Sequence, residues 1–108
     1  MTPRYNTKHG RGTRFDEAVS ATNPHPFVTN GAVSGRENPY EVGQLDAERI
    51  VRFRADRPTF AVYSYATPIA WRASDGSWVM PNERYSSSTS CHQSVTRSML
   101  RGVTVESI

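Results

Sequence analysis

The chain contains 108 residues, carries a formal net charge of +3 and has a single cysteine. This length allows one compact domain, since domains typically contain about 100 to 150 residues. One cysteine excludes an intramolecular disulfide and a zinc site of the multi-cysteine type, and it favours a reducing compartment. Because no stretch approaches the roughly 20 apolar residues that span a bilayer, we expect a cytoplasmic protein that has no membrane contact.

Residues 1–44 are rich in turn-forming residues. They include most of the glycines and the strings "NPHPF", "TNG" and "SGRENP", and they show no sustained period of 2 or 3.6. Such spacing interrupts a helix or strand before it becomes long. We expect an irregular arm over 1–44, with at most one or two helical turns over 15–21. Plain disorder of the arm is the alternative.

From residue 45 onward the pattern is that of a folded domain. The stretch "LDAERIVRFRADRP" fits either a short helix or a strand whose apolar and basic residues alternate. Asp46 is a good helix cap, and the Ala-Glu-Arg that follows favours a helix over 46–55. Pro58 ends either element.

The segment "TFAVYSY", 59–65, is rich in β-branched and aromatic residues and predicts a strand. Because side chains alternate along a strand, Phe60 and Val62 should point to one side and Tyr63 and Tyr65 to the other.

A hairpin is predicted next, from "IAWR" at 69–72 through "ASDG" to "SWVM" at 77–80. An Asp-Gly pair between two aromatic-bearing strands is a strong hairpin signal, because glycine adopts positive φ and aspartate bonds the turn backbone. This pairing would place Trp71 and Trp78 near each other across the two strands.

A second helix is predicted over "TSCHQSVTRSMLRG", with Ser88 or Thr89 as its cap and Gly102 at its end. At about 100° per residue, its apolar and polar side chains separate into two faces. The predicted buried face contains Cys91, Val95 and Met99, with His92 at its edge. The predicted exposed face contains Gln93, Arg97 and Arg101, with Leu100 as an apolar exception.

Together these elements predict an α+β fold. We expect a single small domain over 45–108, in which a small antiparallel sheet of about three strands is packed by a C-terminal amphipathic helix, preceded by the long irregular arm 1–44.

Residues 60–95 carry the strings "VYSYATPIAW", "DGSW" and "YSSSTSCHQ". This block resembles a family of short uncharacterised proteins encoded largely by actinobacterial phages, which share V-Y-S-Y-x-T-P-I-A-W, D-G-x-W and Y-S-x-x-T-S-x-H-Q. The resemblance implies a phage protein that acts in the cytoplasm of a bacterial host. It implies no activity and no catalytic residue.

Catalysis and metal binding are not expected. Ser90, His92 and Asp75 are the residue types of a nucleophilic triad, but Ser90 and His92 stand two apart on the predicted helix and point in different directions. The three histidines have no helix-face spacing, and two of them lie in the arm. We therefore expect no enzyme, no metal site and no cofactor.

The helix 88–101 and the residues before it are the predicted binding site. The run from Arg84 to Val105 contains three arginines and no acidic residue, and hydroxyl groups at the helix start could hold an anion. Capping alone also explains the hydroxyl groups, and this explanation carries the greater weight. The candidate residues for contact with nucleic acid or an anion are Arg84, Tyr85, Ser88, Thr89, Ser90, Gln93, Arg97 and Arg101.

The leading hypothesis is therefore a non-enzymatic phage accessory protein that binds nucleic acid. One alternative is a modulator that binds a host protein through the arm and exposed aromatic residues. Another is a minor virion or assembly component, in which the arm joins copies of the chain into a homo-oligomer. Binding to phosphate should weaken steeply with salt, whereas an interface anchored by aromatic residues should not.

Overall fold

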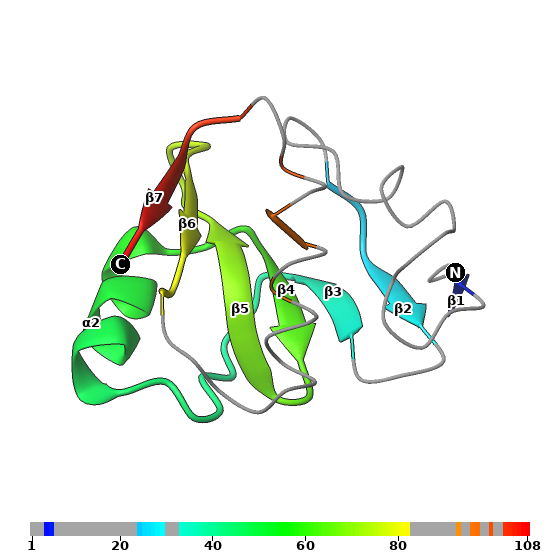
Figure 1. Ribbon diagram of the computed structural model, residues 1–108, viewed down its shortest axis with the longest axis horizontal. Coiled ribbons are helices and arrows are strands. Elements are labelled where there is room, and N and C mark those ends of the chain that lie inside the picture. Colours follow the sequence, from blue (N-terminus) through cyan, green and yellow to red (C-terminus); the bar gives the residue numbers. More distant parts are fainter. Residues whose placement is uncertain are drawn as a thin grey trace.

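The computed structural model describes residues 4–5, 24–29, 33–82, 93, 96–97, 100 and 103–108. In these ranges the chain forms one sheet of seven strands, ordered β1 to β7 as in the sequence, and the helix α2 (Figure 1). The described residues 93, 96 and 97 are helical as well. Neighbouring strands are antiparallel from β2 to β6, whereas β1 pairs with β2 and β7 pairs with β6 in parallel. The elements are β1 (Arg4–Tyr5), β2 (Phe27–Thr29), β3 (Val33–Glu37), α2 (Ala47–Asp56), β4 (Phe60–Ser64), β5 (Thr67–Arg72), β6 (Trp78–Met80) and β7 (Val105–Ser107).

This architecture corrects the predicted fold. The small antiparallel sheet of about three strands is wrong, because the sheet is larger and mixed. The helix α2, which precedes the predicted strands, packs on the sheet. The described residues 93, 96 and 97 of the predicted C-terminal segment are helical, but the last element of the chain is the strand β7. The three predicted strands do exist as β4, β5 and β6, at the centre of the sheet and toward one edge.

The predicted arm 1–44 contributes to this sheet. Within its described part, β3 pairs with β4 over five residues, and β2 pairs with β3. The described segments 27–29 and 33–37 are therefore strands of the sheet and not an irregular arm, and the sheet contains strands from both sides of the expected boundary at residue 45. The backbone N–H and C=O groups of a short strand form hydrogen bonds with a neighbouring strand. The pattern of apolar residues within one short segment does not reveal this pairing. The expected helical turns over 15–21 lie outside the described residues.

One side of the sheet, the apolar face, is covered by hydrocarbon and aromatic groups. The ring of Phe60 meets that of Trp78 edge to face, with centroids 6.3 Å apart. β3 passes close to the Phe60 ring, since a Cβ on Gly35 would lie 2.6 Å from Cζ of Phe60. The buried residues of the apolar face are Phe27, Val33, Phe60, Val62, Ile69, Ala70, Trp78, Met80 and Leu100.

The opposite side, the helix face, lies under α2 (Figure 1). Phe53 of the helix meets Trp71 of β5 edge to face, with ring centroids 5.1 Å apart. Because both faces are covered, all five residues of β4 are buried. The buried residues of the helix face are Leu45, Phe53, Ala61, Tyr63, Trp71 and Val79, against which Val42, Ile50 and Ile108 pack.

Helix α2 confirms the helical prediction for this segment and its cap. The side chain of Asp46 accepts a hydrogen bond from the backbone N–H of Arg49 at 2.9 Å, and this bond lowers the pKa of Asp46. The helix ends at Arg57, whose φ of 47° and ψ of 61° lie in the left-handed region. Pro58 then prevents continuation, as expected.

The carboxylate of Asp56 connects α2 to the sheet. Its Oδ2 accepts a hydrogen bond from Nε1 of Trp71 at 2.8 Å, and both of its oxygens lie 2.9 Å from Nε of Arg52. Arg52 also forms an ion pair with Glu106 of β7. We call Asp56, Trp71, Arg52 and Glu106 the Asp56 tether, because it joins the helix, β5 and β7 through charge-assisted hydrogen bonds.

The predicted hairpin is present, but its register differs by one residue. Asp75 accepts hydrogen bonds from the backbone and the hydroxyl of Ser77, which keeps Ser77 in the turn. Trp78 consequently pairs with Arg72, and Trp71 pairs with Val79. Since a shift of one residue moves side chains to the other side of a sheet, the two tryptophans lie on opposite faces and not together.

The alternation of side chains predicted over 59–65 named four residues, and it is confirmed for three of them. Phe60 and Val62 belong to the apolar face and Tyr63 to the helix face. Tyr65 instead lies in the turn after β4, exposed and with a φ of 57°. In the ranges that the structure describes, no helix has the length and apolar content needed to cross a bilayer.

Candidate functional site

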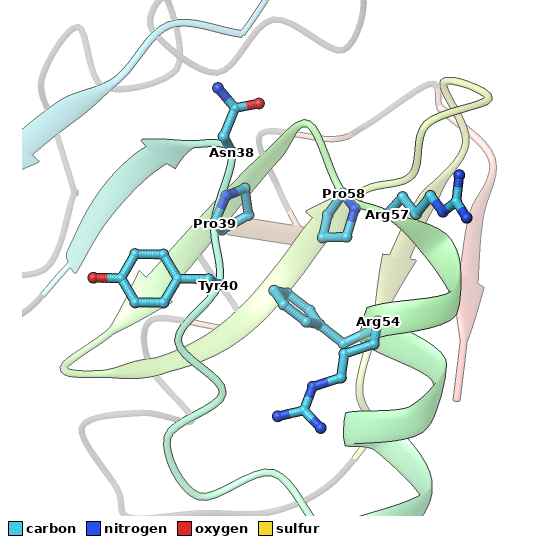
Figure 2. Close-up of a pocket in the computed structure, with 7 residues that line it drawn as sticks. Asn38, Pro39, Tyr40, Arg54, Arg57 and Pro58 are labelled. Atoms are coloured by element: carbon cyan, nitrogen blue, oxygen red, sulfur yellow. The ribbon is translucent and has the colours of Figure 1, made fainter.

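An open pocket of about 330 Å³ lies where the end of β3 meets the end of α2 (Figure 2). Two prolines and the edge of a buried aromatic ring contribute its apolar part, and two arginines, an asparagine and a tyrosine contribute its polar part. The lining residues are Asn38, Pro39, Tyr40, Phe53, Arg54, Arg57 and Pro58.

Two short segments, one after β3 and one after α2, build the pocket and are tied to each other. The backbone N–H of Asn38 donates to the carbonyl of Thr59 at 3.0 Å. Asn38 and Arg57 both have left-handed backbones, with φ of 46° and 47°. This conformation is uncommon outside glycine, although asparagine tolerates it better than arginine does. Two of the three such residues in the described part of the chain therefore line one pocket.

The two arginines of the pocket differ from the two that precede them on α2. Arg49 and Arg52 form ion pairs with Asp46, Asp56 and Glu106. Arg54 and Arg57 are exposed and form no ion pair with any residue that the structure describes. No carboxylate is present among the lining residues. Their positive charges are therefore available to an external anion.

The position of these arginines also has a plain structural explanation. A cation in the last turn of a helix interacts favourably with the helix dipole, which contributes about 0.3–1 kcal/mol at an exposed site. Arg54 fits this role. Arg57 fits it less well, because an arginine in the left-handed position that ends a helix costs free energy that a glycine there would not.

Tyr40 projects from a fixed loop. Its side chain is 81% exposed, and Figure 2 shows its ring extending away from the helix. The loop is held from beneath by Tyr63, whose hydroxyl donates to the carbonyl of Glu41 at 2.6 Å. The guanidinium of Arg36 lies 4.2 Å from the centre of the Tyr63 ring and pairs with Glu41 at 3.2 Å. Burial raises the pKa of Tyr63 to about 12, so this anchoring hydroxyl stays protonated at neutral pH.

Of the residues predicted for the site on the C-terminal helix, the structure describes Gln93 and Arg97. Gln93, expected on the exposed face, is buried, and its amide donates to the carbonyl of Pro81 at 3.3 Å. Thr96 and Leu100 are buried as well, and Leu100 belongs to the apolar face. Arg97 is exposed, as expected. Gln93, Thr96 and Leu100 are thus the buried residues of this segment among those described, and Leu100 packs in the core.

The remaining candidates lie outside the described residues. They are Arg84, Tyr85, Ser88, Thr89, Ser90 and Arg101. Cys91 and His92, assigned to the buried face and its edge, lie outside them as well, and so do Val95 and Met99.

Sequence reasoning missed the pocket between β3 and α2. Its arginines were treated only as part of a helix or a strand, and its tyrosine lay in the presumed arm. One signal was available in the strings "ENPY" and "RADRP". Each contains a proline, which is typical of turns, next to or near a side chain that is common in binding sites: a tyrosine in the first string and arginines in the second. That signal is weak in each string alone, because only the pairing of β3 with β4 brings the two strings together.

Among the described residues, no group of three or more histidine, cysteine, aspartate or glutamate side chains is arranged to hold a metal ion. The chemistry that the pocket offers is recognition through cations, an amide and aromatic or proline rings.

The model of a family of unknown function, DUF8033, matches residues 23–96, which is more than half of the chain. The chain belongs to this family. The DUF8033 match begins before β2 and includes all the lining residues of the pocket. It therefore treats part of the presumed arm and the central strands as one unit. No curated protein and no solved structure matches the chain.

Proposed function

We propose that this protein is a non-enzymatic module that binds nucleic acid through the pocket between β3 and α2. The observation that carries the proposal is the pair Arg54 and Arg57, two exposed guanidinium groups that have no ion pair within the described structure. They flank an open pocket beside an exposed tyrosine.

Phosphate is the anion that this arrangement suits. A guanidinium group presents planar N–H donors that match the oxygens of a phosphate, and it remains charged at any physiological pH. The net charge of +3 supports weak to moderate attraction and not the tight binding of a strongly basic protein. We expect contacts to the backbone to supply most of the affinity and little sequence preference.

The setting that we propose is the cytoplasm of a bacterial host, where the protein would act as a phage accessory factor. The resemblance of the block in residues 60–95 to short phage proteins supports this setting. Membership of DUF8033 is consistent with an uncharacterised family and adds no activity.

Binding to a host protein is the second candidate. The apolar part of the pocket, formed by Phe53, Pro39 and Pro58, could accept an apolar side chain, while the arginines attract neighbouring acidic residues. The exposed ring of Tyr40 is of the type that anchors protein interfaces. Such an interface would depend less on salt than phosphate binding does.

The experiment is fluorescence anisotropy of labelled DNA and RNA oligonucleotides with the purified protein, at low and near-physiological salt. The variant Arg54→Ala/Arg57→Ala should bind more weakly. Its salt dependence should be shallower by about 1.4 log units of affinity per log unit of salt, because each single-strand phosphate that is no longer neutralised removes about 0.7.

The matched control is Arg97→Ala/Arg101→Ala. It lowers the net charge from +3 to +1, as the pocket variant does, but changes residues outside the pocket. The proposal requires the pocket variant to lose more affinity than this control. Equal losses would mean that only net charge matters, and a larger loss in the control would return the site to the C-terminal segment. Absence of binding at low salt would overturn nucleic-acid binding altogether.

A further inference from the structure

We infer that the pocket accepts one unpaired base, whose neighbouring phosphates contact Arg54 and Arg57, so that the protein prefers single-stranded nucleic acid to duplex. This inference rests on the proposed function and specifies the class of its ligand.

The composition of the pocket favours a flat ligand. Its apolar part is contributed by three residues that carry rings, Pro39, Pro58 and Phe53. A flat, largely apolar group packs well on such a surface. The volume of about 330 Å³ lies at the small end of the range for ligand pockets, which suits a single ring system.

The position of Tyr40 favours stacking on an unpaired base. A tyrosine ring that is 81% exposed leaves most of its face open, and here it stands at the rim of the pocket on a loop that Tyr63 and Thr59 hold in place. Aromatic rings held in this way stack on bases with little sequence preference. Bases in a duplex present their edges in the grooves while their faces are covered by neighbours, so only an unpaired base offers a face to stack on.

The directions of the two arginines favour a strand that crosses the pocket. In Figure 2 Arg54 and Arg57 extend from the pocket toward different sides, so they do not close on one anion together. A strand that places a base in the pocket continues on both sides of it, with a phosphate on each. One guanidinium per flanking phosphate fits this path.

The left-handed backbones of Asn38 and Arg57 support the assignment. Strained residues persist where surrounding structure holds them, and they cluster at binding sites. Arg57 has this left-handed backbone, and its side chain extends outward from the end of α2 (Figure 2). The amide of Asn38, on the other segment of the pocket, offers a donor and an acceptor for the edge of the base.

The test compares three labelled ligands of equal length in the same anisotropy assay. They are a single strand of thymidines, a strand of abasic sites that keeps the phosphates, and a duplex. We expect the thymidine strand to bind about tenfold or more tightly than the abasic strand, within the range typical of stacking by one base. The duplex should bind no better than the abasic strand.

Two variants of Tyr40 complete the design. Tyr40→Ala should reduce binding of the thymidine strand to the level of the abasic strand, yet leave the salt dependence unchanged, because the arginines still bind the phosphates. Tyr40→Phe should retain binding, since it keeps the ring. Circular dichroism of each variant controls for folding.

The outcomes separate the two proposals. If the three ligands bind equally and Tyr40→Ala has no effect while Arg54→Ala/Arg57→Ala does, the unpaired-base inference is overturned and phosphate binding stands. If none of the ligands binds, both fail. Binding of an acidic peptide that contains an aromatic residue, in place of all three oligonucleotides, would establish a protein partner instead.

Discussion

Side chains are buried on both faces of the sheet, but the two faces differ in the interactions that hold them. The apolar face contains the edge-to-face rings of Phe60 and Trp78 among hydrocarbon side chains. The helix face has a matching pair, Phe53 and Trp71, and adds the Asp56 tether. A carboxylate bound to two partners fixes the direction of α2 as well as its distance from the sheet. The pocket between β3 and α2 lies at the end of this tethered helix.

Removing a ring from the apolar face should cause the largest loss of stability. Trp78→Ala leaves a cavity beside Phe60 in a cluster whose members are almost fully buried, and such changes cost about 3–5 kcal/mol. Urea unfolding followed by circular dichroism measures this free energy. A loss below about 1 kcal/mol would show that this face contributes far less than its burial indicates.

Breaking the tether should have a smaller effect on stability. Asp56→Ala leaves Nε1 of Trp71 without its acceptor in a buried position and frees Arg52, at a cost of about 1–3 kcal/mol. The same variant should also weaken oligonucleotide binding, because α2 carries Arg54. If the tether is the cause, adding Trp71→Phe should change stability by much less in the Asp56→Ala background than in the original protein. Equal effects in both backgrounds would contradict the coupling.

Removing the hydroxyl of Tyr63 beneath the pocket loop should reduce the stability by a still smaller amount. Tyr63→Phe removes the hydrogen bond to the carbonyl of Glu41, worth about 0.5–1.5 kcal/mol. Because burial raises the pKa of this phenol from 10.0 to about 12, the stability that it contributes is fully present below pH 10 and is lost as the pH rises through 12. Unfolding free energies measured across this range should fall less steeply for Tyr63→Phe than for the original protein. An identical slope would exclude this phenol as the titrating group.

The smallest effect should have the opposite sign. Arg57→Gly relieves a left-handed backbone at the end of α2 and should stabilise the protein by roughly 0.5–1 kcal/mol while weakening oligonucleotide binding. Arg57→Ala removes the same charge but keeps the strain, so it should weaken binding without the gain in stability. Thermal unfolding and anisotropy of the two variants measure both quantities. Unchanged binding in Arg57→Gly would remove Arg57 from the site.

Local sequence patterns predicted individual helices, strands and turns better than they predicted how these elements pair. Asp46 as a cap, the strand around Phe60 and Val62, and the Asp-Gly turn follow from neighbours within a few residues, and each is confirmed. The hairpin register could not be predicted, because Ser77 could enter either the turn or the strand. The backbone N–H and the hydroxyl of Ser77 donate hydrogen bonds to Asp75, which places Ser77 in the turn. Trp71 and Trp78 therefore do not pair.

The candidate site shows the same limit more strongly. Gln93 and Arg97 looked equivalent on a helical projection, yet one is buried and the other exposed. A projection compares side chains only within one segment. It does not show that the core accepts Leu100, which turns Gln93 inward with it.

The sequence by itself determined where helix α2 begins and ends and which central segments are strands, since caps, prolines and β-branched runs act through the adjacent backbone. Only the tertiary structure decided that residues 27–29 and 33–37 join the sheet, that side chains on both of its faces are buried and that two distant segments form one pocket. Those outcomes depend on pairing and burial between parts of the chain far apart in sequence, and neither composition nor periodicity encodes such interactions in any one segment.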